Sequence, residues 1–232
     1  MSYTKLVSKI VDKSLKKVYY ELVISISGVT IFYKEVKVMN KEFKQIEKYA
    51  EEHNVPIMEK SGINFLTKYI SENNIKNILE IGSAIGYSSI KMALINDKIK
   101  VTTIERDDER YLVALKNIKE FNLDKRITLI HADALEIELE EKYDLIFIDA
   151  AKGQYIKFFE KYSNNLKKNG VIISDNIEFH GLVNKEERIE SKNLRQLVNK
   201  IRNYIDFLKE NTEFTTKFYK IGDGISVSTK ND

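Results

Sequence analysis

The sequence has no cysteine and no tryptophan, and Pro56 is its only proline. Without cysteine the chain cannot form disulfides, thiolate zinc sites or a cysteine nucleophile, which excludes a disulfide-stabilised scaffold and a thiol enzyme. A large excess of one charge is also missing, since the formal net charge is only +3. The overall charge therefore gives no sign of nucleic-acid binding. A chain of 232 residues, 43% hydrophobic and 31% charged, fits one α/β domain with a substantial core.

Long apolar runs are also absent. The longest, residues 18–33, is interrupted by Glu21, Ser25, Ser27 and Gly28. It is shorter and more polar than the ~20 apolar residues that cross a membrane. It also lacks the basic start and small-residue cleavage site of a signal peptide. We therefore expect a cytoplasmic protein with no membrane partner.

The small positive surplus is concentrated in one segment. Between His180 and Arg202, six basic and three acidic residues give a net charge of +3, equal to that of the whole chain. A helix of this composition is usually a solvated face, and the alternative is a basic binding surface. The basic residues are Lys185, Arg188, Lys192, Arg195, Lys200 and Arg202.

The chain divides near residue 40. Residues 1–40 are Lys-rich at the start and carry two β-branched runs around Gly28, which could form a hairpin, a helix and a strand, or an arm packed on another subunit. Residues 41–232 show a regular alternation of apolar strands and amphipathic helices. We therefore predict an N-terminal extension over residues 1–40, with an oligomer arm as one of its alternatives, followed by one α/β domain over residues 41–232.

This alternation predicts a Rossmann-like, doubly wound α/β fold. Its sheet is mostly parallel, with helices on both faces. One helix is expected to run through Phe158 and Leu166 and to stop at Asn169-Gly170. Near the C-terminus, Gly222-Asp223-Gly224 predicts an antiparallel hairpin. The expected parallel strands are Ile75–Ile81, Ile99–Ile104, Ile127–Ile130, Tyr143–Ile148 and Val171–Ser174.

Acidic or amide side chains stand at or near the end of every predicted parallel strand. Ligands of such sheets bind beyond the carboxyl ends of the strands. The chemistry is therefore expected there, at Glu80-Ile81-Gly82, Glu105, Asp133, Asp149 and Asp175-Asn176.

The first two of these strand ends indicate a nucleoside cofactor. The loop from Gly82 to Gly86 joins a strand to a helix, but Ala84 replaces the second glycine of a dinucleotide fingerprint and no P-loop lysine follows. Glu105 could accept hydrogen bonds from both ribose hydroxyls. Asp133 adds a polar edge for an adenine. The alternatives are a plain turn for the loop, a helix-start carboxylate for Glu105 and a helix N-cap for Asp133.

Asp149, Asp175 and Asn176 are the strongest sign of chemistry. Two carboxylates and an amide supply hard oxygen ligands suited to magnesium or calcium rather than zinc. Two adjacent aspartates without a cation would repel each other. Lys152 follows Asp149 by three residues and is a candidate base. The alternatives are separate capping roles for the acidic side chains and a solvated lysine.

Other catalytic patterns are not found. His53, His131 and His180 have no ligand spacing and are interpreted as incidental. No serine has the sequence context of a hydrolase nucleophile.

Four segments together resemble the catechol O-methyltransferase-like family. They are residues 79–88, 104–106, 147–152 and 174–176. Residues 49–60, Lys152-Gly153-Gln154-Tyr155 and Gly222-Asp223-Gly224 are similar to one bacterial subgroup, the tRNA 5-hydroxyuridine methyltransferases. The similarity runs from about Lys41 to Lys230.

The resemblance implies an S-adenosyl-L-methionine- and Mg²⁺-dependent O-methyltransferase, expected to be a homodimer. Lys152 would lie near the reacting oxygen, with Asp149 beside it. Magnesium would be bound by Asp149, Asp175 and Asn176. The cofactor would be held by Met58, Gly82, Ser88, Glu105, Asp133 and Asp149.

Three functions remain open at this point. The first is methylation of 5-hydroxyuridine at the tRNA wobble position, and the second is methylation of a small catechol or caffeoyl-type molecule. Both acceptors present two adjacent oxygens to a metal. The third is a cofactor-sensing protein without catalysis. Contacts to an anticodon would come from Tyr155, Phe179, Lys185, Arg188 and Arg195.

Overall fold

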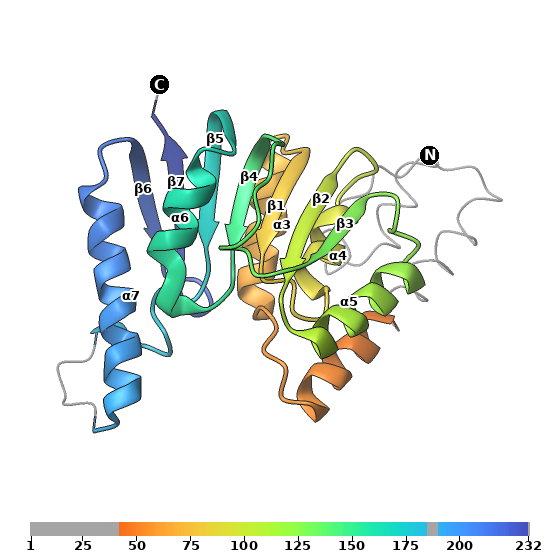
Figure 1. Ribbon diagram of the computed structural model, residues 1–232, viewed down its shortest axis with the longest axis horizontal. Helices are drawn as coiled ribbons and strands as arrows, with labels where there is room; N and C mark the ends of the chain where they lie inside the picture. Colours follow the sequence, from red (N-terminus) through yellow and green to blue (C-terminus); the bar gives the residue numbers. More distant parts are fainter. Residues whose placement is uncertain (1–41, 185–189, 232) are drawn as a thin grey trace, which may run out of the picture. The chain divides into compact units, whose positions relative to one another are not determined.

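The computed structural model describes residues 42–184 and 190–231. The predicted extension at 1–40, Lys185 and Arg188 lie outside these residues. The described part contains a seven-stranded sheet of order β3-β2-β1-β4-β5-β7-β6 (Figure 1). The first five strands in sequence are parallel, and β7 runs antiparallel to both β5 and β6. The predicted doubly wound sheet with a C-terminal hairpin is confirmed.

Helices and strands alternate along most of the described chain. A helix over residues 42–52 comes first. The later helices are α3 (Lys60–Glu72), α4 (Tyr87–Ala93), α5 (Asp108–Glu120), α6 (Tyr155–Ser163) and α7 (Lys192–Glu210). Short 3-10 turns are η2 (Lys152–Gln154) and η3 (Leu182–Asn184). The strands are β1 (Asn77–Ile81), β2 (Lys100–Glu105), β3 (Ile127–His131), β4 (Tyr143–Ile148), β5 (Leu166–Ser174), β6 (Phe214–Tyr219) and β7 (Ile225–Lys230).

The register of the central strands positions the site. Ile81 at the end of β1 pairs with Ile148 at the end of β4, and Ile148 pairs with Ser174 at the end of β5. The residues that follow these strand ends therefore emerge side by side at one edge of the sheet. Because β4 is covered on both faces, only Asp144 in it is not fully buried.

Helices α6 and α7 cover one face of the sheet. Phe159 of α6 makes edge-to-face contacts with Phe207 of α7 and Phe214 of β6, at ring-centroid distances of 5.4 and 4.8 Å. The same buried cluster includes Ile146 and Ile172 from the two central strands. Interlocking aromatic rings fix how these helices pack on the sheet.

Helix α5 contacts the loop from Gly82 to Gly86, called the glycine loop below, which joins β1 to α4. The side-chain amide of Asn117 in α5 donates a hydrogen bond of 2.8 Å to the carbonyl of Ile85. A Cβ at Gly86, the residue before α4, would lie 3.5 Å from Ala114 of α5. Helix α5 begins at its Asp107 cap, which accepts from the Arg110 N–H at 2.9 Å. The loop that leaves β1 is thus supported from below.

The prediction that α6 continues to Asn169-Gly170 is wrong. Helix α6 stops at Ser163, and Leu166 already belongs to β5. The side chain of Asn165 donates to the carbonyls of Leu139 and Glu141, at 2.7 and 3.0 Å, and thus ties the chain to the preceding loop. The Asn165 carbonyl also accepts from the Tyr143 N–H of β4 at 2.8 Å, so the backbone already pairs with the sheet where the helix would have to continue. The pairing of β5 with β4 then shifts register, and Asn169 adopts a left-handed φ of 59°.

Within the described residues, no helix is both long enough and apolar enough to cross a membrane.

Candidate active site

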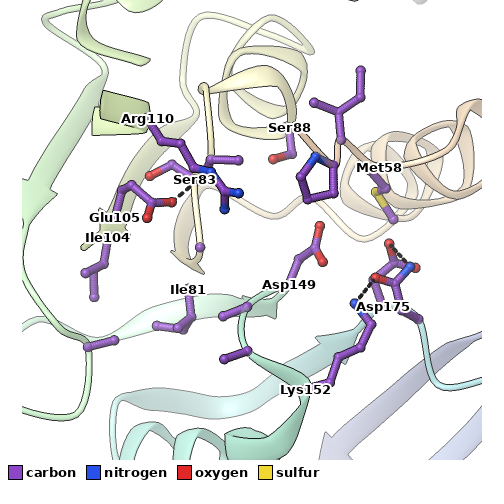
Figure 2. A pocket seen from close by; sticks show the side chains of 18 of the residues that line it. Met58, Ile81, Ser83, Ser88, Ile104, Glu105, Arg110, Asp149, Lys152 and Asp175 are labelled. Carbon is purple, nitrogen blue, oxygen red and sulfur yellow. Dashed lines mark hydrogen bonds between the residues drawn. The ribbon is translucent and has the colours of Figure 1, made fainter. Parts of the chain in front are cut away.

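A cavity of about 460 Å³ opens at the carboxyl edge of the sheet. Figure 2 shows Glu105 and Arg110 toward one end of it and Asp149, Lys152 and Asp175 toward the other. Its size lies in the range usual for small-molecule and cofactor sites. Every site residue predicted from the sequence lines it: Met58, Gly82, Ser88, Glu105, Asp133, Asp149, Lys152, Asp175 and Asn176.

The glycine loop brings the backbone unusually close to the end of β4. Gly82 has a φ of 95°, and a Cβ there would lie 2.3 Å from the carbonyl oxygen of Asp149. Ala84, at the position of the missing second glycine, also adopts a left-handed φ of 45°. Its N–H donates to Glu105 at 2.8 Å. The loop is therefore more than a plain turn, because it locks the ends of β1, β2 and β4 together.

Glu105 is held by the backbone on three sides. Besides the Ala84 N–H, its carboxylate accepts from the N–H groups of Arg106 and Asp107, each at 2.9 Å. The helix-start alternative is wrong, because Asp107 rather than Glu105 caps α5. This fixed carboxylate lines the cavity and retains acceptor capacity on its second oxygen, which only the Ala84 N–H occupies, for a further donor such as a ribose hydroxyl.

Asp133 closes a turn rather than capping a helix. One carboxylate oxygen accepts from the Leu135 N–H at 2.9 Å, and the other accepts from Arg106 at 3.2 Å. No helix follows directly, so the N-cap alternative is wrong. The hydrogen bond from Leu135 is the main cause that lowers the pKa of Asp133. Asp133 thus presents a charged edge at the Glu105 end of the cavity.

Ser83 is a site residue that the sequence reasoning did not single out. Its hydroxyl is buried and has no hydrogen-bond partner among the described residues, and the residue lines the cavity. Such an orphaned polar atom is the kind that a bound ligand satisfies. Its signal in the sequence was only its place in the loop. The fixed Glu105 carboxylate, the close backbone at Gly82 and the Ser83 hydroxyl together fit a polar nucleoside cofactor.

Glu80, named from the sequence among the strand-end residues but given no role there, is buried below the loop. The hydroxyls of Ser88 and Thr103 both donate to its carboxylate, the latter at 2.6 Å. Burial raises the pKa of Glu80 to about 7, against the lowering effect of these hydroxyls. Ser88, predicted to contact the cofactor, is thus also the residue that ties α4 to β1.

We expect Glu80 to make stability pH-dependent. Because its folded pKa of about 7 exceeds the ordinary value of 4.5, the folded state binds the extra proton between these pH values. Stability should therefore fall as pH rises from about 4.5 to 7, by about 3 kcal/mol for this group. In Glu80→Gln this part of the loss should vanish. Urea unfolding of both proteins from pH 5 to 8 measures the difference, and parallel curves would contradict the expectation.

Asp149, Asp175 and Asn176 meet at the other end of the cavity, as predicted. The side-chain amide of Asn176 donates to Asp175 at 3.3 Å, and Lys152 donates to the amide oxygen of Asn176 at 2.7 Å. Burial, and then the charge of Asp149, raises the pKa of Asp175 to about 8. Burial also raises the pKa of Asp149, while Lys152 opposes the shift. The capping alternative does not account for this convergence.

This donor set fits a hard divalent cation. In the described residues, no three or more His, Cys, Asp or Glu side chains are grouped so that they could hold a metal ion. The third oxygen donor of this set is the side-chain amide of Asn176. Two carboxylates and an amide oxygen are ligands that Mg²⁺ accepts, with water or substrate filling the remaining positions. A cation would also offset the burial and the repulsion by Asp149 that together raise the pKa of Asp175.

Two further predictions concern residues near the end of the cavity formed by Asp149, Asp175 and Asn176. Tyr155, predicted to stack on a base, is only 1% exposed, and its hydroxyl donates to the Asp175 carbonyl at 3.1 Å, so it is a core residue. His180, interpreted from the sequence as incidental, lines the cavity together with Asp223. The spacing of His180 and Asp223 in the sequence does not indicate that they meet, because only the folded hairpin brings the two residues together.

The sheet order and this site define a class I methyltransferase fold, the S-adenosylmethionine-dependent type. The O-methyltransferase family profile matches residues 34–231, and the chain belongs to that family. Tapetum-specific methyltransferase 1 of Arabidopsis thaliana is 30% identical, over 78% of this chain and 81% of its own. A caffeoyl-CoA O-methyltransferase of Populus kitakamiensis is 28% identical, over 70% and 73%.

Solved structures agree with this assignment. A Staphylococcus aureus protein, provisionally named a caffeoyl-CoA O-methyltransferase, is 38% identical with a TM-score of 0.79, covering 87% of this chain and 98% of its own. An O-methyltransferase of Bacillus cereus in complex with S-adenosylhomocysteine is 25% identical with a TM-score of 0.70, covering 82% and 91%.

Proposed function

We propose that this protein is an S-adenosylmethionine- and Mg²⁺-dependent O-methyltransferase whose acceptor carries two adjacent oxygens. One observation carries the proposal: Asp149, Asp175 and Asn176 converge in the same cavity as the glycine loop and Glu105. A metal-type donor set and a nucleoside-type pocket thus face each other across one space. A non-catalytic cofactor sensor would have no use for the first of these.

The cofactor assignment draws on geometry and on relatives. Glu105 would accept a hydrogen bond from the ribose, and Asp133, at the same end of the cavity, would accept one from the adenine amino group. Met58 is buried against α3, close enough that a Cβ at Gly62 would lie 3.0 Å from its terminal methyl carbon. It therefore forms a fixed apolar wall for the cofactor. The B. cereus relative holds the demethylated product of this same cofactor.

At the reacting end, the chain supplies charge and alignment. A bound Mg²⁺ would lower the pKa of the acceptor hydroxyl, so that its proton is released to solvent before the transfer. In the transfer, the acceptor oxygen forms a bond to the methyl carbon as the methyl–sulfur bond breaks, which leaves S-adenosylhomocysteine. Lys152, held by its hydrogen bond to Asn176, would stabilise the negative acceptor oxygen. Alignment of the two reactants then accounts for much of the rate.

For the acceptor we propose 5-hydroxyuridine at the tRNA wobble position, methylated to 5-methoxyuridine. Its 4-oxo and 5-hydroxyl oxygens are adjacent, so they suit the same metal site as a catechol. Exposed basic residues of α7 support an RNA partner, since Lys200 lies beside η2, where a Cβ on Gly153 would be 3.2 Å from its ammonium. Because Lys152 and Gln154, the neighbours of Gly153, line the cavity, the charge of Lys200 would contact a phosphate near the bound base.

A small catechol or caffeoyl-type acceptor is the second candidate. The observation that favours it is the naming of the relatives, since the Populus protein is a caffeoyl-CoA O-methyltransferase. Both candidates require the same metal site, so the choice depends on what binds outside the cavity. A homodimer also remains a prediction, which sedimentation of the full chain would test.

The two acceptors differ in their expected response to salt. With tRNA carrying 5-hydroxyuridine, KM should rise steeply between 50 and 200 mM salt, by about tenfold or more, because phosphate contacts release counterions. With caffeoyl-CoA the rise should be much smaller. Lys200→Glu should raise the KM for tRNA further and flatten its salt dependence, while Lys98→Glu, exposed at the opposite edge of the sheet, serves as the matched control. Methyl transfer to caffeoyl-CoA but not to this tRNA would reject the tRNA acceptor.

A further inference from the structure

Asp223 is a buried carboxylate for which the methyl-transfer reaction has no use. It lies in the turn between β6 and β7, is 7% exposed and lines the cavity. Its carboxylate accepts a hydrogen bond from the backbone N–H of His180, and the imidazole Nδ1 of His180 lies 3.6 Å from its second oxygen. Both contacts reach across to the loop that follows Asp175 and Asn176.

The backbone strengthens the same connection. The Glu178 N–H donates to the carbonyl of Asp223 at 2.8 Å, and the Ile177 N–H donates to the carbonyl of Gly224 at 3.1 Å. Gly224 has a φ of 84°, and a Cβ there would lie 2.8 Å from the Glu178 nitrogen. The hairpin turn therefore has to pack directly on the loop, and only a glycine permits this approach.

The loop that is held in this way has an unusual backbone. Phe179 and His180 have φ values of 43° and 55°, and Gly181 follows with 73°. Phenylalanine and histidine seldom adopt this left-handed conformation, so the surrounding structure must maintain it. The conformation directs His180 to the cavity, and the Phe179 ring lies 5.8 Å from the ammonium of Lys152.

We propose that Asp223 is a positioning residue for the acceptor: it holds residues 179–181 in this left-handed conformation, so that His180 forms the acceptor-facing wall of the cavity. This inference rests on the proposed function. The cofactor end, formed by Gly82, Glu105 and Asp133, makes none of these contacts. Loss of the Asp223 carboxylate should thus weaken acceptor binding and leave cofactor binding intact.

The test compares Asp223→Ala, Asp223→Asn and the exposed control Asp97→Ala. In Asp223→Ala, the acceptor KM should rise about tenfold, because the side chains of Phe179 and His180 must become ordered when the acceptor binds. The kcat and the calorimetric Kd for S-adenosylhomocysteine should change less than about twofold. The asparagine side chain in Asp223→Asn retains an oxygen for the His180 N–H, so the acceptor KM of this variant should be close to that of the wild type.

A double-mutant cycle tests whether Asp223 acts through His180. His180→Ala should raise the acceptor KM as Asp223→Ala does, and combining the two substitutions should raise it little further.

Hydrogen–deuterium exchange supplies a readout independent of turnover. Amides of residues 179–182 should exchange faster in Asp223→Ala, and those of residues 82–86 should not. Unchanged exchange at 179–182, or an unchanged acceptor KM in an active enzyme, overturns the role of Asp223. An equal loss of cofactor affinity would make Asp223 a general structural residue and also overturns it. A wild-type protein that methylates neither 5-hydroxyuridine tRNA nor caffeoyl-CoA instead rejects the proposed function.

Discussion

Replacing Asp175 with asparagine is expected to lower kcat by about a thousandfold at saturating cofactor and Mg²⁺. The variant retains an oxygen and the side-chain volume but loses a negative charge at the proposed cation site. Stabilisation of charge by a metal ion contributes several kcal/mol to such reactions, and each ~1.4 kcal/mol corresponds to a tenfold change in rate. Initial rates of methyl transfer, measured against Mg²⁺ concentration, provide the test.

In the absence of metal, the free energy of unfolding of Asp175→Asn should be no lower than that of the wild type. Burial and Asp149 raise the pKa of Asp175 to about 8, so its ionisation is unfavourable in the metal-free protein. Because the folded pKa is raised, the free energy of unfolding should fall as pH increases from about 4 to 8 in the wild type and fall less in Asp175→Asn. Asp124→Asn, an exposed aspartate before β3, is the matched control. Activity of Asp175→Asn within threefold of the wild type would reject the metal site.

Replacing Gly82 with alanine is expected to abolish measurable cofactor binding. The new Cβ would lie 2.3 Å from the carbonyl oxygen of Asp149 and 3.1 Å from the Cα of Ala150, so two strand ends would have to separate. Overpacking and a left-handed alanine together should cost about 2–5 kcal/mol of folding stability. Titration calorimetry with S-adenosylhomocysteine and urea unfolding measure the two effects.

Gly181→Ala is the control that distinguishes the steric clash expected in Gly82→Ala from the strain of a left-handed alanine. Gly181 has a φ of 73°, in the same left-handed region as that of Gly82, but a Cβ there would meet none of the described residues within 4 Å. This variant should lose only about 1–2 kcal/mol and bind the cofactor normally. If Gly82→Ala behaved in the same way, the close approach of the two strand ends would not be needed to form the cofactor pocket.

Much of the site could be read from residues that follow apolar strands. Asp149 and Asp175 each come directly after a strand buried on both faces, so a parallel sheet must bring them to one edge. The same reasoning placed Gly82 and Glu105 correctly. Local patterns served less well where side chains and backbone compete, as at Asn165, whose hydrogen bonds end α6 before the predicted stop at Asn169-Gly170.

The sequence by itself determined the order of strands and helices, and with it the set of oxygen donors at one edge of the sheet, because burial on both faces imposes a pattern that is local in the chain. Only the tertiary structure decided which of these groups are fixed and which meet. The environment of the Ser83 hydroxyl, the pKa of Glu80 and the contact of Asp223 with His180 depend on distances across the fold. Residues 43 positions apart have no periodicity that links them, and their meeting follows from the antiparallel return of β7 alongside β5.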